Sequence, residues 1–253
     1  MSELLICTMG LSPGVVTRMT QYLRKEKHPD LAEVWVVFTD NALINDLYNH
    51  VLRKEFAQNA DFHNITLRRK ALEIISDLKT SEEVKDFAQE FSAFLESKMT
   101  PNGPVVHVCI SGGRKTMTYA AAMAVAKLTT RMGRDAARGK IFVWHVQLAA
   151  EEEFARKDVA WLVDQYRKDS LMPHDQDRFL YPENVDIISV PYLAISFVPY
   201  AARDRAYSGS SSFSASSGVN RGMGKMPASW RASRQAHTTS SWLGATFCLY
   251  QGR

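Results

Sequence analysis

Short apolar runs alternate with amphipathic stretches along most of the chain, and this alternation limits the folds that the chain can adopt. Strands are predicted at residues 3–8 (ELLICT), 33–39 (EVWVVFT), 64–72, 105–110 (VVHVCI), 140–148 (KIFVWHVQL) and 186–190 (DIISV). Helices are predicted between them, at about 13–25, 42–58, 80–98, 114–131 and 151–168, and Thr80 with Glu83 has the spacing of a capping box. Strands that alternate with helices of this length form a mainly parallel sheet with helices on both faces. The sequence therefore predicts an α/β, doubly wound, Rossmann-like sheet of about six strands.

The composition changes after about residue 200. Serine supplies 11 of the 46 residues from Ser208 to Arg253, and neither helical nor strand periodicity continues there. Such a segment buries too little apolar surface to offset the entropy lost on ordering. We therefore expect one folded domain at residues 1–200 and a disordered, serine-rich basic tail at 201–253.

The net charge of +4 comes from that tail. Seven Lys/Arg and one acid follow residue 202, which leaves 24 basic and 26 acidic side chains in the first 202 residues, a net charge of −2. General DNA binding needs a dense cationic surface, so anion recognition by the body of the chain must be local. No apolar run approaches the roughly 20 residues of a membrane helix, and the start MSELLICTMG lacks a basic signal-peptide region. We expect a cytoplasmic protein without membrane contact.

The turn after the first strand is suited to hold an anion. Thr8 ends the strand, Gly10 permits a tight turn, and Ser12 followed by Pro13 is a typical helix start, with a hydroxyl that can cap the helix. Backbone N–H groups and a helix N-terminus at the carboxyl edge of a parallel sheet bind anions. A serine that serves only as a helix cap is the simpler alternative.

The turn ISGGRKTM follows the fourth strand and carries stronger chemistry. Ser111 can cap the next helix, Gly112 and Gly113 let the backbone approach a ligand, and Arg114 and Lys115 supply positive charge. Cations at a helix N-terminus oppose the helix dipole, which favours a visiting anion over a merely solvated helix start. This turn therefore predicts a phosphate site.

A third loop, Thr39-Asp40-Asn41, ends the second strand and can offer hydrogen bonds to a base or ribose. An Asx-type turn before a helix explains the same residues equally well. The Walker A and GxGxxG patterns are absent, so kinase, ATPase and dehydrogenase functions lose their main support.

No His, Cys, Asp or Glu spacing predicts a metal site, and we expect neither a metal nor a cofactor. The three cysteines, Cys7, Cys109 and Cys248, show no metal-like spacing. His107 and His145 lie inside predicted strands, and we interpret them as core or edge histidines.

The pairing of LLICTMGLSPGVVT with CISGGRKTMTYAAAMA resembles the CRISPR-associated Rossmann-fold (CARF) proteins, and most nearly their NE0113-like group. The run FLYPENVDIISVPY is similar to the closing strand of that group, and the resemblance covers about residues 1–195. It implies a homodimer that binds a cyclic oligoadenylate across its two-fold axis. A tetra-adenylate ring suits such a dimer, and a hexa-adenylate ring stays open.

Members of the CARF superfamily either relay ring binding to an effector or cleave the ring themselves. The tail has no room for a folded nuclease effector and no helix-turn-helix pattern, which favours a standalone, metal-independent ring nuclease. The resemblance implies that Lys115 stabilises transition-state charge and that Ser12 positions the ribose or phosphate. A non-catalytic sensor of cyclic oligoadenylate and a monomeric Rossmann-type nucleotide or phosphosugar enzyme remain as alternatives.

Overall fold

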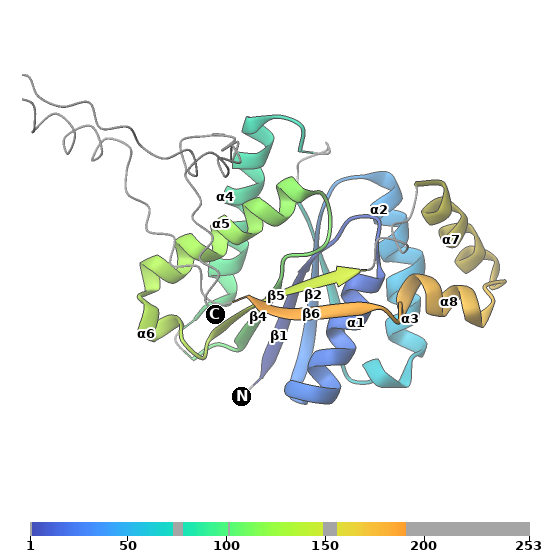
Figure 1. Cartoon of the computed structure of the whole chain (residues 1–253), viewed down its shortest axis with the longest axis horizontal. Coiled ribbons are helices and arrows are strands. Elements are labelled where there is room, and N and C mark those ends of the chain that lie inside the picture. The colour runs from blue at the N-terminus through green and yellow to red at the C-terminus, as the bar shows by residue number, and fades with distance from the viewer. Residues whose placement is uncertain (1, 73–77, 101, 149–155, 191–253) are drawn as a thin grey trace, which may run out of the picture. The chain divides into compact units, whose positions relative to one another are not determined.

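The computed structural model describes residues 2–72, 78–100, 102–148 and 156–190. Its six strands form one sheet in the order β3-β2-β1-β4-β5-β6 (Figure 1). β1 to β5 are parallel, and β6 runs antiparallel to β5. The strands are β1 (Glu3–Thr8), β2 (Leu31–Thr39), β3 (Thr66–Leu72), β4 (Val105–Cys109), β5 (Ile141–Leu148) and β6 (Val185–Val190). The predicted doubly wound, mainly parallel sheet is confirmed.

Helical segments connect the strands. They are α1 (Gly14–Tyr22), η1 (Leu23–Lys27), α2 (Ala42–Asp46), η2 (Leu47–Leu52), α3 (Arg53–Gln58), η3 (Ala60–Phe62), α4 (Ser81–Lys98), α5 (Lys115–Met132), α6 (Arg134–Ala137), α7 (Arg156–Lys168) and α8 (Pro173–Leu180). η1 and η2 are π-helical, and η3 is a single 3₁₀ turn. The predicted helix at 42–58 therefore exists, but a π-helical turn occupies its middle.

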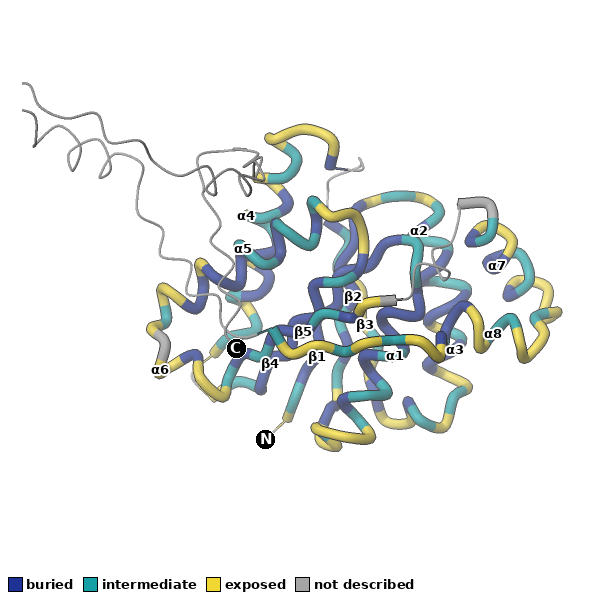
Figure 2. Tube along the Cα trace, in the orientation of Figure 1, coloured by how far each residue is buried: buried dark blue, intermediate teal, exposed yellow. Residues whose placement is uncertain are grey.

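Helices cover both faces of the sheet, and alternate strand residues point to the two faces. Leu5 and Cys7 of β1 pack with α1, η2, α3, α7 and α8, whereas Leu4 and Ile6 pack with α4 and α5. Figure 1 shows these two groups of helices on opposite sides of the sheet, and Figure 2 shows that the central strands are buried. Strands buried on both faces read as continuous apolar runs, which is why the sequence predicts them.

The capping box predicted at the start of α4 is confirmed. The Thr80 hydroxyl accepts a hydrogen bond from the Glu83 N–H (3.2 Å), and the Glu83 carboxylate accepts one from the Thr80 N–H (2.9 Å). This exchange satisfies backbone donors that the first turn of α4 leaves without helical partners. It explains why α4 begins at Ser81.

Some expectations from the sequence concern residues outside the described part of the chain. The first five residues of the helix predicted at 151–168 and the whole tail at 201–253 lie there. In the part that the structure describes, no helix combines the length and apolar character needed to cross a bilayer.

Candidate functional site

Two neighbouring strands end side by side at the carboxyl edge of the sheet. β1 and β4 are parallel, and Cys7 pairs with Cys109 in their register. From this edge the chain runs to opposite faces of the sheet, because α1 follows β1 on one face and α5 follows β4 on the other. Such a divergence creates the crevice in which doubly wound folds bind their ligands. The two turns predicted as anion sites, residues 8–14 and 110–117, both lie at this point.

The two turns contact one another through their backbones. A Cβ atom built on Gly10 would lie 2.6 Å from the Cα of Gly113, and one built on Gly112 would lie 1.7 Å from the carbonyl oxygen of Thr8. No side chain larger than hydrogen fits at Gly10 or Gly112 without moving the backbone of the other turn. Gly10, Gly112 and Gly113 therefore allow the backbones of the two turns to touch. This role comes in addition to the tight turn and the ligand approach that the sequence predicts for them.

Positive charge is exposed on the second turn. Gly113, Arg114 and Lys115 are exposed, and Arg114 is the N-cap residue of α5 without a capping side-chain hydrogen bond. The first turn of α5 holds no acidic residue. Two cations thus lie at the positive end of an 18-residue helix, an arrangement that an anionic ligand would stabilise.

The prediction that Ser111 caps α5 is wrong. Its hydroxyl oxygen instead accepts a hydrogen bond from the Val146 N–H of β5 and lies 3.1 Å from Nδ1 of His145. Ser111 lies three residues before Arg114, which occupies the N-cap position of α5, so Ser111 is not placed to cap the helix. His145 is half-buried, and burial lowers its pKa. The sequence shows His145 only as a strand residue, since its contact with the turn spans 34 positions.

The prediction that Ser12 caps α1 is also wrong. Pro13 occupies the N-cap position of α1, and no side chain makes a capping hydrogen bond there. Ser12 is half-buried in the first turn, so its hydroxyl is not committed to the helix. Thr8 has a structural contact instead: it is buried, and its hydroxyl donates to the carbonyl oxygen of Cys109 across the strand pair (3.5 Å).

The third loop lies beside the first turn, because β2 neighbours β1. Asn41 is the N-cap of α2, and its side-chain oxygen accepts from the N–H groups of Leu43 (3.0 Å) and Ile44 (3.4 Å). The capping alternative therefore describes Asn41. Thr39 is buried, whereas Asp40 is exposed. The Asp40 carboxylate accepts a hydrogen bond from the side-chain amide of Asn45 in α2 (2.8 Å).

Comparison with known proteins is informative at the level of the family. The family model of CRISPR-associated protein NE0113 matches residues 12–208, which are 197 of the 253 residues. The chain belongs to the NE0113 family. No curated protein sequence matches this NE0113-family chain. A solved structure, Enterococcus italicus Csm6 bound to cyclic hexa-2'-fluoro-hexa-dAMP, is similar with a TM-score of 0.45 and 11% identity. The match covers 75% of this chain and 42% of that chain, so this chain spans less than half of that protein.

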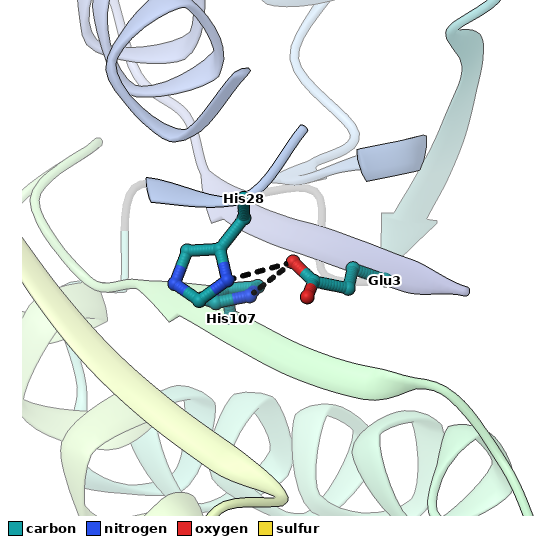
Figure 3. A group of neighbouring side chains, drawn as sticks. All are labelled: Glu3, His28 and His107. Carbon is teal, nitrogen blue, oxygen red and sulfur yellow. Dashed lines mark hydrogen bonds and ion pairs between the residues drawn. The ribbon is translucent and has the colours of Figure 1, made fainter. Parts of the chain in front are cut away.

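The NE0113-family chain also has a polar cluster near the amino ends of the strands, which sequence analysis did not predict. Oε2 of Glu3 lies 2.9 Å from Nδ1 of His28 and 3.2 Å from Nε2 of His107 (Figure 3). These three atoms all lie within 4.8 Å of one another, a spacing that could hold a metal ion. Folding brings the three together from the first strand, the end of η1 and the fourth strand, so no spacing motif could reveal them.

The proton positions in this cluster do not suit a metal ion. Nε1–H of Trp144 donates to Nδ1 of His107 (3.1 Å), so the single proton of the neutral imidazole lies on Nε2 and is donated to Glu3. Burial, assisted by the charge of His28, lowers the pKa of His107 to about 3, so the ring stays neutral. A metal ion bound at Nε2 of His107 would leave the ring proton on Nδ1. That proton would then point at the N–H of Trp144, and the hydrogen bond between them would be lost. The cluster is therefore suited to cross-link β1, β4 and β5.

Proposed function

We propose that this chain binds a cyclic oligoadenylate at the two touching turns and cleaves it to linear products that end in a 2′,3′-cyclic phosphate. The observation that carries the proposal is the close backbone contact of Gly10 with Gly113 and of Thr8 with Gly112, next to the exposed Arg114 and Lys115. Membership of a CRISPR-associated family supports a ligand from that defence system. The resemblance of both turns to CARF proteins supports the ring as its chemical form.

The residues of the site suit each part of this chemistry. An RNA-type phosphodiester carries its own nucleophile, the ribose 2′-oxygen, which attacks phosphorus while the bond to the 5′-oxygen breaks. The 2′-hydroxyl loses its proton, and the departing 5′-oxygen gains one. The protein must hold the nucleophile in line and neutralise charge on the pentavalent transition state. No co-substrate is needed, because both reacting groups belong to the ring.

Within this proposal, each turn has its own task. Ser12, whose hydroxyl makes no capping bond, positions the ribose or phosphate. The N–H groups of Gly112 and Gly113 and the guanidinium of Arg114 bind phosphate, and Lys115 stabilises the developing negative charge. Thr8, Gly10, Ser111 and the loop Thr39-Asp40-Asn41 form the surroundings of the ring. A homodimer would place two copies of this site against one ring, and a tetra-adenylate ring matches that two-fold symmetry.

The direct test uses purified full-length protein in EDTA with cyclic tetra-adenylate and cyclic hexa-adenylate, followed by mass spectrometry. Linear products with a 2′,3′-cyclic phosphate are expected, with the tetra-adenylate cleaved faster. If the ring binds in calorimetry but stays intact, the protein senses the ring and does not cleave it. A protein that neither binds nor cleaves either ring would overturn the whole proposal.

The role of Lys115 is tested by the Lys115→Ala variant. Removing a cation that contacts the transition state is expected to lower the cleavage rate by at least about a hundredfold and to weaken ring binding. Lys127→Ala is the matched control, because Lys127 is an exposed lysine further along the same helix. A Lys115→Ala variant that cleaves at the wild-type rate would remove Lys115 from the mechanism.

A further inference from the structure

We propose that His145 is a positioning residue that holds the ring-binding turn in place through Ser111. This inference rests on the proposed function, because it concerns the same turn. Nδ1 of His145 lies 3.1 Å from the Ser111 hydroxyl oxygen, and His145 belongs to β5, which neighbours β4 in the sheet. The pair therefore connects the turn after β4 to the neighbouring strand β5.

The hydrogen-bond partners of Ser111 determine which way its proton points. The Ser111 oxygen accepts from the backbone N–H of Val146, and the Cys109 thiol donates to it as a weaker partner (Sγ to Oγ, 3.7 Å). These two donors occupy both lone pairs of the hydroxyl. The Ser111 hydrogen is thus directed to Nδ1 of His145, which must be the unprotonated nitrogen. His145 accepts at Nδ1 and carries its proton on Nε2.

The position of Ser111 explains why this contact matters for the turn. Ser111 precedes Gly112, whose Cα lies so close to the Thr8 carbonyl that no Cβ fits between them. A shift of Ser111 would move Gly112 and, with it, the N–H groups that face the proposed phosphate. Two bonds from Ser111 to successive residues of β5, His145 and Val146, fix the turn in both position and rotation.

The environment of His145 keeps Nδ1 available as an acceptor. The side chain is half-buried on the sheet face that α4 and α5 cover, since its neighbours Trp144 and Val146 pack on the other face. Burial disfavours the charged imidazolium, which agrees with the lowered pKa of His145.

Two isosteric substitutions separate this role from other roles of His145. Asparagine places its oxygen where Nδ1 lies, whereas glutamine places its terminal atoms near Nε2. Relative to wild type, His145→Gln and His145→Ala are each expected to bind cyclic tetra-adenylate about tenfold more weakly, the size of one lost hydrogen bond. Ser111→Ala is expected to bind at least as weakly, because it also loses the bond from the Val146 N–H. His145→Asn is expected to stay within about twofold of wild type, because the acceptor is retained. Equal losses in His145→Asn and His145→Gln, or a loss in His145→Asn alone, would overturn the proposal.

The double variant provides a second test of the coupling. If His145 acts through Ser111, the Ser111→Ala/His145→Ala variant is expected to bind about as weakly as Ser111→Ala alone. A further loss of about tenfold beyond that of Ser111→Ala would show two independent contributions and refute the positioning role. Urea midpoints of all variants show whether a loss of affinity only reflects a loss of global stability.

A measurement without ligand keeps the inference testable if the proposed function fails. Amide hydrogen exchange of Gly112 and Gly113 is expected to be faster in His145→Ala, His145→Gln and Ser111→Ala, and near the wild-type rate in His145→Asn. If the wild-type protein binds no ring but the variants differ from it in exchange as expected, the proposed function is wrong and the positioning role stands. Normal ring binding with unchanged exchange in all variants would refute the positioning role alone.

Discussion

Gly112→Ala is the substitution that most directly tests the contact between the two turns. A Cβ at Gly112 would lie 1.7 Å from the carbonyl oxygen of Thr8 and 2.8 Å from the Cα of Met9. Real Cβ atoms essentially never approach a heavy atom outside their own residue and its chain neighbours closer than 3.0 Å. The two turns must therefore separate by more than 1 Å, and both obstructing atoms belong to the backbone, so no side-chain rotation relieves the overlap.

The magnitude follows from the cost of overpacking a rigid site. Extra atoms in a well-packed core cost about 1–3 kcal/mol, and a backbone obstacle places Gly112→Ala at the upper end, at about 3 kcal/mol of unfolding free energy. The obstacle lies in the last residue of β1, so the shift also displaces the turn that carries Gly113 and Arg114. Binding of cyclic tetra-adenylate is expected to weaken at least about tenfold, because the phosphate-binding N–H groups move.

The assay combines urea unfolding with calorimetric binding of cyclic tetra-adenylate. Gly133→Ala is the matched control, because Gly133 has a φ of +83° but no atom beyond its own chain neighbours lies within 4 Å of the position that its Cβ would occupy. That control is expected to cost about 1–3 kcal/mol of stability through backbone strain and to leave ring affinity unchanged. Wild-type affinity in Gly112→Ala, or an equal loss of affinity in Gly133→Ala, would refute the reasoning.

Three further outcomes are expected. Glu55 is buried and accepts hydrogen bonds from Tyr166 (3.1 Å), Gln176 (2.8 Å) and Tyr181, so Glu55→Ala is expected to cost about 3 kcal/mol or more in urea unfolding, whereas the exposed Glu26→Ala costs little. The pKa of His107 is about 3 in the fold and about 6.5 in the unfolded chain, so the unfolded state binds more protons between these pH values. The free energy of unfolding is therefore expected to fall as the pH drops from 6.5 toward 3. His107→Phe should show a smaller fall over the same pH range. A chain that ends at residue 200 is expected to keep its melting temperature and ring binding, since β6, the last strand in the described part of the chain, ends at Val190 and the sequence predicts no further folded element after residue 200.

Local patterns in the sequence determined the elements of the fold. The run ELLICT predicts β1 with its observed bounds, because a strand buried on both faces needs apolar residues at every position. Thr80 and Glu83 predict the start of α4, because a capping box is complete within four residues. The short helix α8 was missed, since its two turns contain only two buried apolar residues, Phe179 and Leu180, and both lie at its end.

The sequence also predicted an anion site at each of the two turns that follow the first and fourth strands, where doubly wound sheets bind their ligands. The turns' actual contacts came from the tertiary structure alone. Ser111 binds the β5 backbone and His145 instead of capping its own helix, and Gly112 lies against Thr8, more than 100 positions earlier. Periodicity and capping depend on residues within one or two turns, so a local stretch of sequence is enough to specify them. Which hydroxyl meets which histidine depends on strand order and register, and these are decided only when the whole sheet packs.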